Sequence, residues 1–131
     1  MHTPVEQNFD VIVIGTGPGG EGAAMEATKQ GKRVGTIERM PQIGGACTHL
    51  GTIPSKSLRA AIYRLMDVNS APVFRQLGVN LEVSFRDLRR SAQSVIDQQV
   101  GMRRSFYDRN DVEVLRGDAR FLDTQRIHVE H

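Results

Sequence analysis

The chain has 131 residues, enough to bury the core of one domain without disulfides or metals. Its 17 Lys and Arg residues against 15 Asp and Glu give a formal net charge of +2, and no long basic run indicates nucleic acid as the main partner. The apolar runs are too short to span a bilayer, and residues 1–8 lack the features of a secretory signal. We therefore expect a soluble, cytoplasmic protein of one domain.

The first third of the chain predicts a strand, a helix and a second strand. Residues 9–14 form a short apolar, β-branched run, typical of a fully buried parallel strand. Small residues recur at helical spacing across 19–30, and Gly31 lies where a left-handed glycine would end the helix. A strand over residues 33–37 then ends at Glu38. This order predicts a right-handed βαβ unit, and hence a parallel sheet in an α/β fold.

The middle of the chain predicts one helix and a connecting segment. After a glycine-rich loop, Pro54 and Ser55 open a helix with one apolar face. That face is formed by Leu58, Ala61, Ile62, Leu65 and Met66. Residues 69–80 contain Pro and Gly and show no clear period, so we interpret them as a connection.

A long helix and two strands are predicted for the rest of the chain. Ser84 and Asp87 resemble a capping box before a helix over residues 85–108. We expect the wet face of this helix to carry Arg103, Arg104 and Arg109. Apolar, β-rich segments at 112–115 and 127–129 predict the two strands.

The glycine-rich segment GTGPGG follows the first predicted strand and opens the first predicted helix. In its GxGxxG pattern, Gly15 would form the tight turn, and Gly17 would leave room for a pyrophosphate. Gly20 would let the helix pack closely on the strand. The amides at the helix start would hold the phosphates. Glu38, at the end of the next strand, is placed to accept hydrogen bonds from adenosine ribose hydroxyls. The alternative is that the glycines form a purely structural turn and that Glu38 is a solvated acid at the end of a strand. That alternative does not account for the spacing between the glycines and Glu38.

Three segments together resemble one group of flavoproteins. The run from Val11 to Glu38, followed by Gly44 and Gly45, resembles the FAD fingerprint of the flavoproteins with two dinucleotide-binding domains. GGACTHLGTIPSK, residues 44–56, resembles the disulfide reductases of the glutathione reductase and dihydrolipoamide dehydrogenase type. GDARF, residues 117–121, resembles their strand segment that approaches the adenine.

This resemblance implies a fold and a cofactor. Residues 1–131 would be the N-terminal part of a Rossmann-like FAD-binding domain with an incomplete parallel sheet, without the nicotinamide-nucleotide and dimerisation domains. No metal is implied. The implied FAD-binding residues are Gly15, Gly17, Gly19, Gly20, Glu38, Arg39, Gly44, Gly45, Ala46, Cys47, Lys56 and Ala119.

One position departs from the pattern of those reductases. Their helix begins with two cysteines separated by four residues, whereas here Cys47 is the only cysteine of the chain and Thr52 occupies the second position. A hydroxyl forms neither a disulfide nor a thiolate, so we expect that this helix carries out no dithiol chemistry. We interpret Cys47 as a small residue beside the flavin ring rather than a reactive thiol, and His49 as a backbone hydrogen-bonding group.

The ThrHis pair after the cysteine and residues 51–56 resemble the family of soluble pyridine nucleotide transhydrogenases. This implies that FAD carries hydride from NADPH to NAD⁺, with Lys56 near the flavin N5 edge, where its charge favours the reduced ring. A solvated helix lysine is the alternative for Lys56. The full-length protein would be a homo-oligomer, whereas the 131 residues alone would be inactive and could self-associate. Two other functions stay open: a flavin-dependent NAD(P)H:quinone reductase and a non-catalytic nucleotide-binding module.

Overall fold

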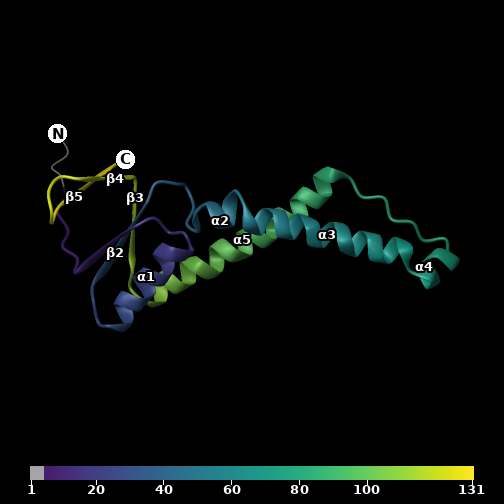
Figure 1. Cartoon of the computed structure of the whole chain (residues 1–131), viewed down its shortest axis with the longest axis horizontal. Helices are drawn as coiled ribbons and strands as arrows, with labels where there is room; N and C mark the ends of the chain where they lie inside the picture. Colours follow the sequence, from purple (N-terminus) through teal and green to yellow (C-terminus); the bar gives the residue numbers. More distant parts are fainter. Residues whose placement is uncertain (1–4) are drawn as a thin grey trace. The chain divides into compact units, whose positions relative to one another are not determined.

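The computed structural model describes residues 5–131 (Figure 1). These residues form two compact units: the first takes in the chain up to Gly45 and again from Met102, and the second is Ala46–Gly101. Among the described helices, none combines the length and apolar content that crossing a membrane requires.

The first unit contains the predicted parallel sheet. Its strands are β1 (Val11–Ile14), β2 (Val34–Glu38) and β3 (Glu113–Arg116), in the order β1-β2-β3 and all parallel. Helix α1 (Pro18–Lys29) connects the first two strands. The chain turns out of the helix at Gly31 as predicted: the φ of Gly31 is +74°, and its N–H donates to the carbonyl of Thr28 at 2.9 Å. The α/β fold with a parallel sheet is therefore confirmed.

Strand β1 differs from the prediction of a fully buried strand. Three of its residues are half-buried and Ile14 is 52% exposed, whereas every residue of β2 is buried. The reason is its place in the sheet, because β1 pairs only with β2 within residues 5–131. An apolar run predicts a strand, but it does not show whether both sides of that strand are paired.

The C-terminal segment adds a strand pair that was not predicted as a pair. β4 (Asp118–Phe121) and β5 (Ile127–Glu130) are antiparallel, with Phe121 opposite Ile127. The turn between them is held by the Asp123 carboxylate, which accepts hydrogen bonds from the N–H groups of Gln125 and Arg126 at 2.8 Å each. Such a side-chain turn fixes the register of a short hairpin.

The C-terminal end of helix α5 (Phe85–Arg109) belongs to the first unit and corrects one prediction. Arg103 was expected on a wet face, but its side chain is only 12% exposed and its Nε lies 3.1 Å from Oε2 of Glu21 on α1. A buried guanidinium needs a partner of opposite charge, and the acid in the first turn of α1 provides one. One helical turn further on, Tyr107 is 1% exposed and is part of the core.

The second unit is helical and starts earlier than predicted. A short helix, α2 (Gly45–His49), occupies part of the predicted glycine-rich loop, and α3 (Thr52–Ser70) begins at Thr52 rather than Pro54. The connection predicted at 69–80 contains another short helix, α4 (Pro72–Gln76), whose proline lies in its first turn.

The apolar face predicted for α3 is only partly covered. Leu58, Ala61 and Leu65 are half-buried, whereas Ile62 and Met66 are exposed.

The long helix α5 begins as predicted. The Ser84 hydroxyl oxygen accepts a hydrogen bond from the Asp87 N–H at 3.2 Å, which is the interaction of an N-cap. The Asp87 carboxylate accepts from the Ser84 hydroxyl at 2.6 Å instead of reaching a backbone N–H, so the reciprocal half of a capping box is missing.

Candidate functional site

The turn after β1 has an open, amide-lined surface. Gly15 has a φ of +97°, and its N–H donates to the carbonyl of Ile37 at 2.7 Å, which places the turn against the end of β2. A Cβ added at Gly15, Gly17 or Gly19 would meet no atom within 4 Å. Helix α1 begins next to this space, so the first amides of the helix and its dipole are available to an anionic group.

Gly20 lies where α1 comes closest to this turn. A Cβ at Gly20 would lie 2.0 Å from the carbonyl oxygen of Gly15 and 3.3 Å from Cγ1 of Val13. Any other residue would push the start of the helix away from β1. The close packing that the GxGxxG spacing predicts at its third glycine is therefore present in the geometry.

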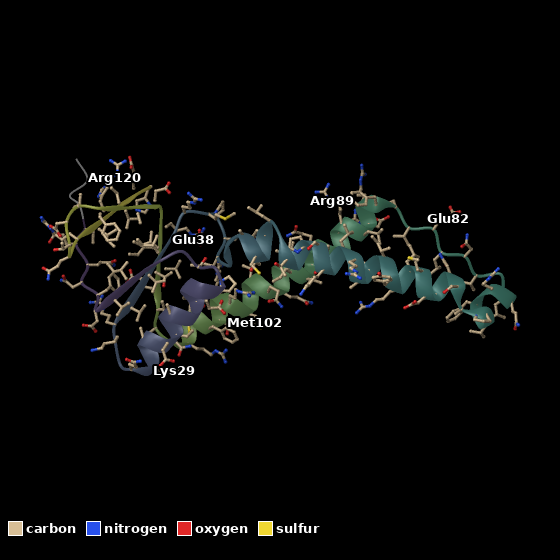
Figure 2. The ribbon with its side chains drawn as sticks, viewed as in Figure 1. Lys29, Glu38, Glu82, Arg89, Met102 and Arg120 are labelled. Carbon is tan, nitrogen blue, oxygen red and sulfur yellow. The ribbon has the colours of Figure 1, made fainter. Side chains whose placement is uncertain are left out.

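Glu38, which is labelled in Figure 2, is the last residue of β2. It is a buried acid whose carboxylate accepts hydrogen bonds on both oxygens. Oε2 accepts from the Thr16 N–H at 3.0 Å and also from the Thr16 hydroxyl, and Oε1 accepts from the Met40 N–H at 2.8 Å. Burial acts to raise the pKa of Glu38, but the Thr16 hydroxyl, the two N–H groups and the charge of Arg39 together hold it below its ordinary value. The side chain is therefore a carboxylate at neutral pH.

The glycine pair lies against the first glycine turn. Gly44 and Gly45 have φ values of +118° and +64°, and the Gly44 N–H donates to Oγ1 of Thr16 at 2.9 Å. A Cβ at Gly45 would lie 2.7 Å from Cα of Gly17. Two segments separated in the sequence are thus held in contact, and a side chain at Gly45 would push them apart.

A hollow of about 240 Å³ connects Glu38 to the strand pair. Four of the predicted FAD residues line it, namely Gly15, Glu38, Arg39 and Ala119. Asp118, at the start of β4, lines the same hollow. The structure thus brings the strand segment GDARF next to the acid that the fingerprint places on a ribose.

The remaining predicted residues lie in the second unit. Ala46 is exposed, Cys47 is a half-buried free thiol in α2, and Lys56 is exposed near the start of α3. Their roles beside a flavin stay predictions. Across residues 5–131, the structure contains no group of three His, Cys, Asp or Glu side chains that could hold a metal ion.

Sequence reasoning missed two residues that shape the site. Thr16 is fully buried and contacts both Glu38 and Gly44, and its only signal in the sequence was a hydroxyl between two glycines. Arg116, at the end of β3, donates from its guanidinium to the carbonyl of Met40 at 2.9 Å and to the carbonyl of Pro41. It holds the loop that follows Glu38, and it is found only once β3 is known to pair with β2.

The chain is similar to proteins of one oxidoreductase family. Residues 9–130 match the family described as "Pyridine nucleotide-disulphide oxidoreductase". The chain is 50% identical over 124 residues to a soluble pyridine nucleotide transhydrogenase of Azotobacter vinelandii, which covers 95% of this chain and 27% of the relative. A protein with the same name from Vibrio parahaemolyticus is 52% identical over 122 residues, 93% of this chain and 26% of the relative. The chain thus spans about a quarter of the length of these curated relatives.

Solved structures show the same fold at lower identity. The Cu(II) complex of the HOCl-induced flavoprotein disulfide reductase RclA from Escherichia coli aligns with a TM-score of 0.71 and 23% identity, over 96% of this chain and 25% of that chain. A second RclA structure aligns with a TM-score of 0.67 over 90% of this chain and 24% of that chain. At this identity the comparison supports the arrangement of helices and strands alone.

Proposed function

Because the chain belongs to the pyridine nucleotide-disulphide oxidoreductase family, we propose that it forms the N-terminal part of the FAD-binding domain of a cytoplasmic flavoprotein. The activity proposed for the whole protein is hydride transfer between NADPH and NAD⁺. The names of the relatives that are about half identical to this chain support this activity. The nicotinamide-nucleotide site and the contacts of a homo-oligomer would come from the remaining length that such relatives have.

The first unit fits the ADP half of FAD. The open surface over Gly15, Gly17 and Gly19 has room for a pyrophosphate, and the start of α1 offers N–H groups to it. The hollow bounded by Glu38, Arg39 and Ala119 would take the adenosine. Glu38 is held charged there, so it would accept a hydrogen bond from a ribose hydroxyl and would repel a phosphate group on the same ribose.

The second unit would supply residues to the flavin half. In this proposal Ala46 and Cys47 lie beside the isoalloxazine ring, and Lys56 places a positive charge near N5. FAD, when bound, supplies two-electron hydride chemistry. The work of this chain is to hold the phosphates, orient the adenosine and provide the Lys56 charge. We propose that the 131 residues alone do not turn over, because no second nucleotide fingerprint occurs in them.

One observation separates this function from that of the disulfide reductases. Thr52 stands at the first residue of α3, where the resembling reductases carry the second cysteine, and Cys47 is the only cysteine of the chain. A threonine side chain has no sulfur atom, so it cannot form a disulfide with Cys47. We therefore propose a flavin that works without a redox-active disulfide from this helix.

An anaerobic reductive titration of the full-length protein tests this proposal. We expect full reduction of the flavin with one two-electron equivalent, with no long-wavelength thiolate-to-flavin band at the midpoint. The Cys47→Ser variant is the matched control, and it should take up the same number of electrons. In parallel, NADPH should reduce thionicotinamide NAD⁺ faster than it reduces added quinones.

Two results would contradict the proposal. Uptake of a second equivalent that disappears in Cys47→Ser would show that this thiol has a redox partner. Quinone reduction that exceeds nucleotide reduction would favour the quinone reductase instead.

A further inference from the structure

Thr16 makes three hydrogen bonds, although no prediction assigned it a role. It is fully buried between the glycines of the first turn. Its N–H donates to Oε2 of Glu38 at 3.0 Å, and its hydroxyl donates to the same oxygen. The hydroxyl oxygen also accepts the hydrogen bond from the Gly44 N–H at 2.9 Å. One side chain therefore connects the first glycine turn, the strand-end acid and the glycine pair.

The hydrogen-bond capacity of Glu38 shows what this connection achieves. A carboxylate has about four lone-pair sites for hydrogen bonds, two on each oxygen. Thr16 occupies both sites of Oε2, and the Met40 N–H, at 2.8 Å, occupies one site of Oε1. A single acceptor site remains on Oε1. The orientation of the carboxylate is therefore fixed before any ligand binds, and only one ligand hydroxyl can bond to it directly.

We propose that Thr16 is a positioning residue for dinucleotide binding: its hydroxyl fixes which oxygen of Glu38 is left for the adenosine ribose and ties the Gly44–Gly45 turn to the same point. This inference rests on the proposed FAD-binding function. It goes beyond the fingerprint, in which the residue between the first two glycines carries no assigned role. The two effects come from one hydroxyl, so loss of that hydroxyl should loosen both at once.

The charge of Glu38 should also depend on Thr16. Without the hydroxyl, the buried carboxylate loses its strongest stabilising donor, and its pKa should rise. The ionisable groups near it are Arg39 next to it, Tyr107 from α5, Arg116 opposite it on β3, and Asp118 across the hollow. None of these changes in a Thr16 variant, so a shift in the pH dependence of FAD binding would report on Glu38.

The test compares hydroxyl removal at two buried threonines. Thr16→Val keeps the shape of the side chain but removes the hydroxyl, and Thr16→Ser keeps the hydroxyl. The matched control is Thr36→Val on β2, because Thr36 is also fully buried but its hydroxyl has no hydrogen-bond partner within residues 5–131. All variants are made in the full-length protein, and FAD affinity is measured by fluorescence titration of the apoprotein from pH 4 to pH 8.

We expect the two valine variants to differ clearly. Thr16→Val should raise the Kd for FAD about tenfold, in line with the loss of a hydrogen bond to a charged group. When the pH is lowered, the FAD affinity of this variant should begin to fall at a higher pH than that of the wild type, because the pKa of Glu38 is raised. Thr16→Ser and Thr36→Val should stay within about twofold of the wild type, with an unchanged pH profile. If Thr16→Val does not fold, the pair Thr16→Ala and Thr36→Ala takes its place.

A second measurement needs no FAD. Amide hydrogen exchange of the peptide that contains Gly44, followed by mass spectrometry in the apoprotein, should be faster in Thr16→Val than in the wild type, Thr16→Ser or Thr36→Val. If the wild-type protein binds no FAD, the proposed function fails, and the exchange rate alone decides the role of Thr16. Equal FAD affinity and equal exchange in both valine variants would overturn the proposal. So would a Thr16→Ser variant that behaves like Thr16→Val.

Discussion

Replacement of Gly20 by alanine should break the contact between α1 and the first glycine turn. The added Cβ would lie 2.0 Å from the carbonyl oxygen of Gly15, although real Cβ contacts are essentially never shorter than 3.0 Å. The start of α1 must therefore move by about 1 Å or distort the turn. Both responses shift the amides that are proposed to hold the pyrophosphate.

The size of the effect follows from comparison with Gly22, one half-turn further along the same helix. Alanine is favoured over glycine inside a helix by about 0.5–1 kcal/mol at either position. A Cβ at Gly22 would meet nothing within 4 Å, so Gly22→Ala should gain this amount. Gly20→Ala has the same gain but adds overpacking of about 1–3 kcal/mol. The difference between the variants is therefore the overpacking alone, at the upper end because the obstructing atom is backbone.

Urea unfolding followed by circular dichroism, together with FAD titration, measures this difference. Gly20→Ala should unfold at lower urea than the wild type and lose at least tenfold in FAD affinity, because hydrogen bonds weaken steeply with misplacement of about 1 Å. Gly22→Ala should unfold at slightly higher urea and bind FAD as the wild type does. Equal stability and affinity of the two alanine variants would refute the packing argument.

Two further substitutions test the core and the strand pair. Tyr107→Phe should raise the free energy of unfolding by up to about 1 kcal/mol, because the buried hydroxyl has no hydrogen-bond partner within the described residues. Burial, with the charges of Glu21 and Glu38, raises the pKa of Tyr107 to about 12. Ionisation of this buried phenol opposes folding, so the fold keeps its full stability below about pH 10 and loses stability as the pH rises from there through about 12. Alkaline titration of the tyrosinate absorbance should show a phase near pH 12 that Tyr107→Phe removes; a phase that persists contradicts the assignment. Gly117→Ala should lower the free energy of unfolding, measured in urea, by more than about 1 kcal/mol, because the φ of Gly117 is +137° and an added Cβ would lie 2.4 Å from the Glu130 carbonyl oxygen. An unchanged urea midpoint would show that β4 and β5 can move apart at this position without cost.

The βαβ unit and its glycine turn could be predicted because their signals are local. The spacing of Gly15, Gly17 and Gly20 after an apolar run specifies a turn and a close helix at once. The end of α1 at Gly31 follows from its positive φ, which glycine adopts without strain. Each of these features depends on residues within one or two turns of chain.

The features that were missed depend on residues far apart in the sequence. Arg103 looked like a solvated charge on its own helix, and only Glu21, on α1, explains its burial. The same holds for Thr16, because its hydroxyl finds Glu38 and Gly44 only after the chain has folded back. A pattern along one element cannot indicate which charge or hydroxyl the neighbouring element provides.

The pairing of β2 with β3 has a consequence for the order of folding. Residues 39–112 connect these neighbouring strands, and this connection includes the entire helical second unit. The entropic cost of closing a loop grows only with the logarithm of its length, so doubling the length of this connection would cost about 0.6 kcal/mol. Contacts between residues far apart in the sequence lower the folding rate far more than they lower the stability of the folded state. We therefore expect β1, α1 and β2 to assemble first and β3 to join them late. A change in the length of the helical unit should alter the folding rate of the sheet more than the stability of the sheet.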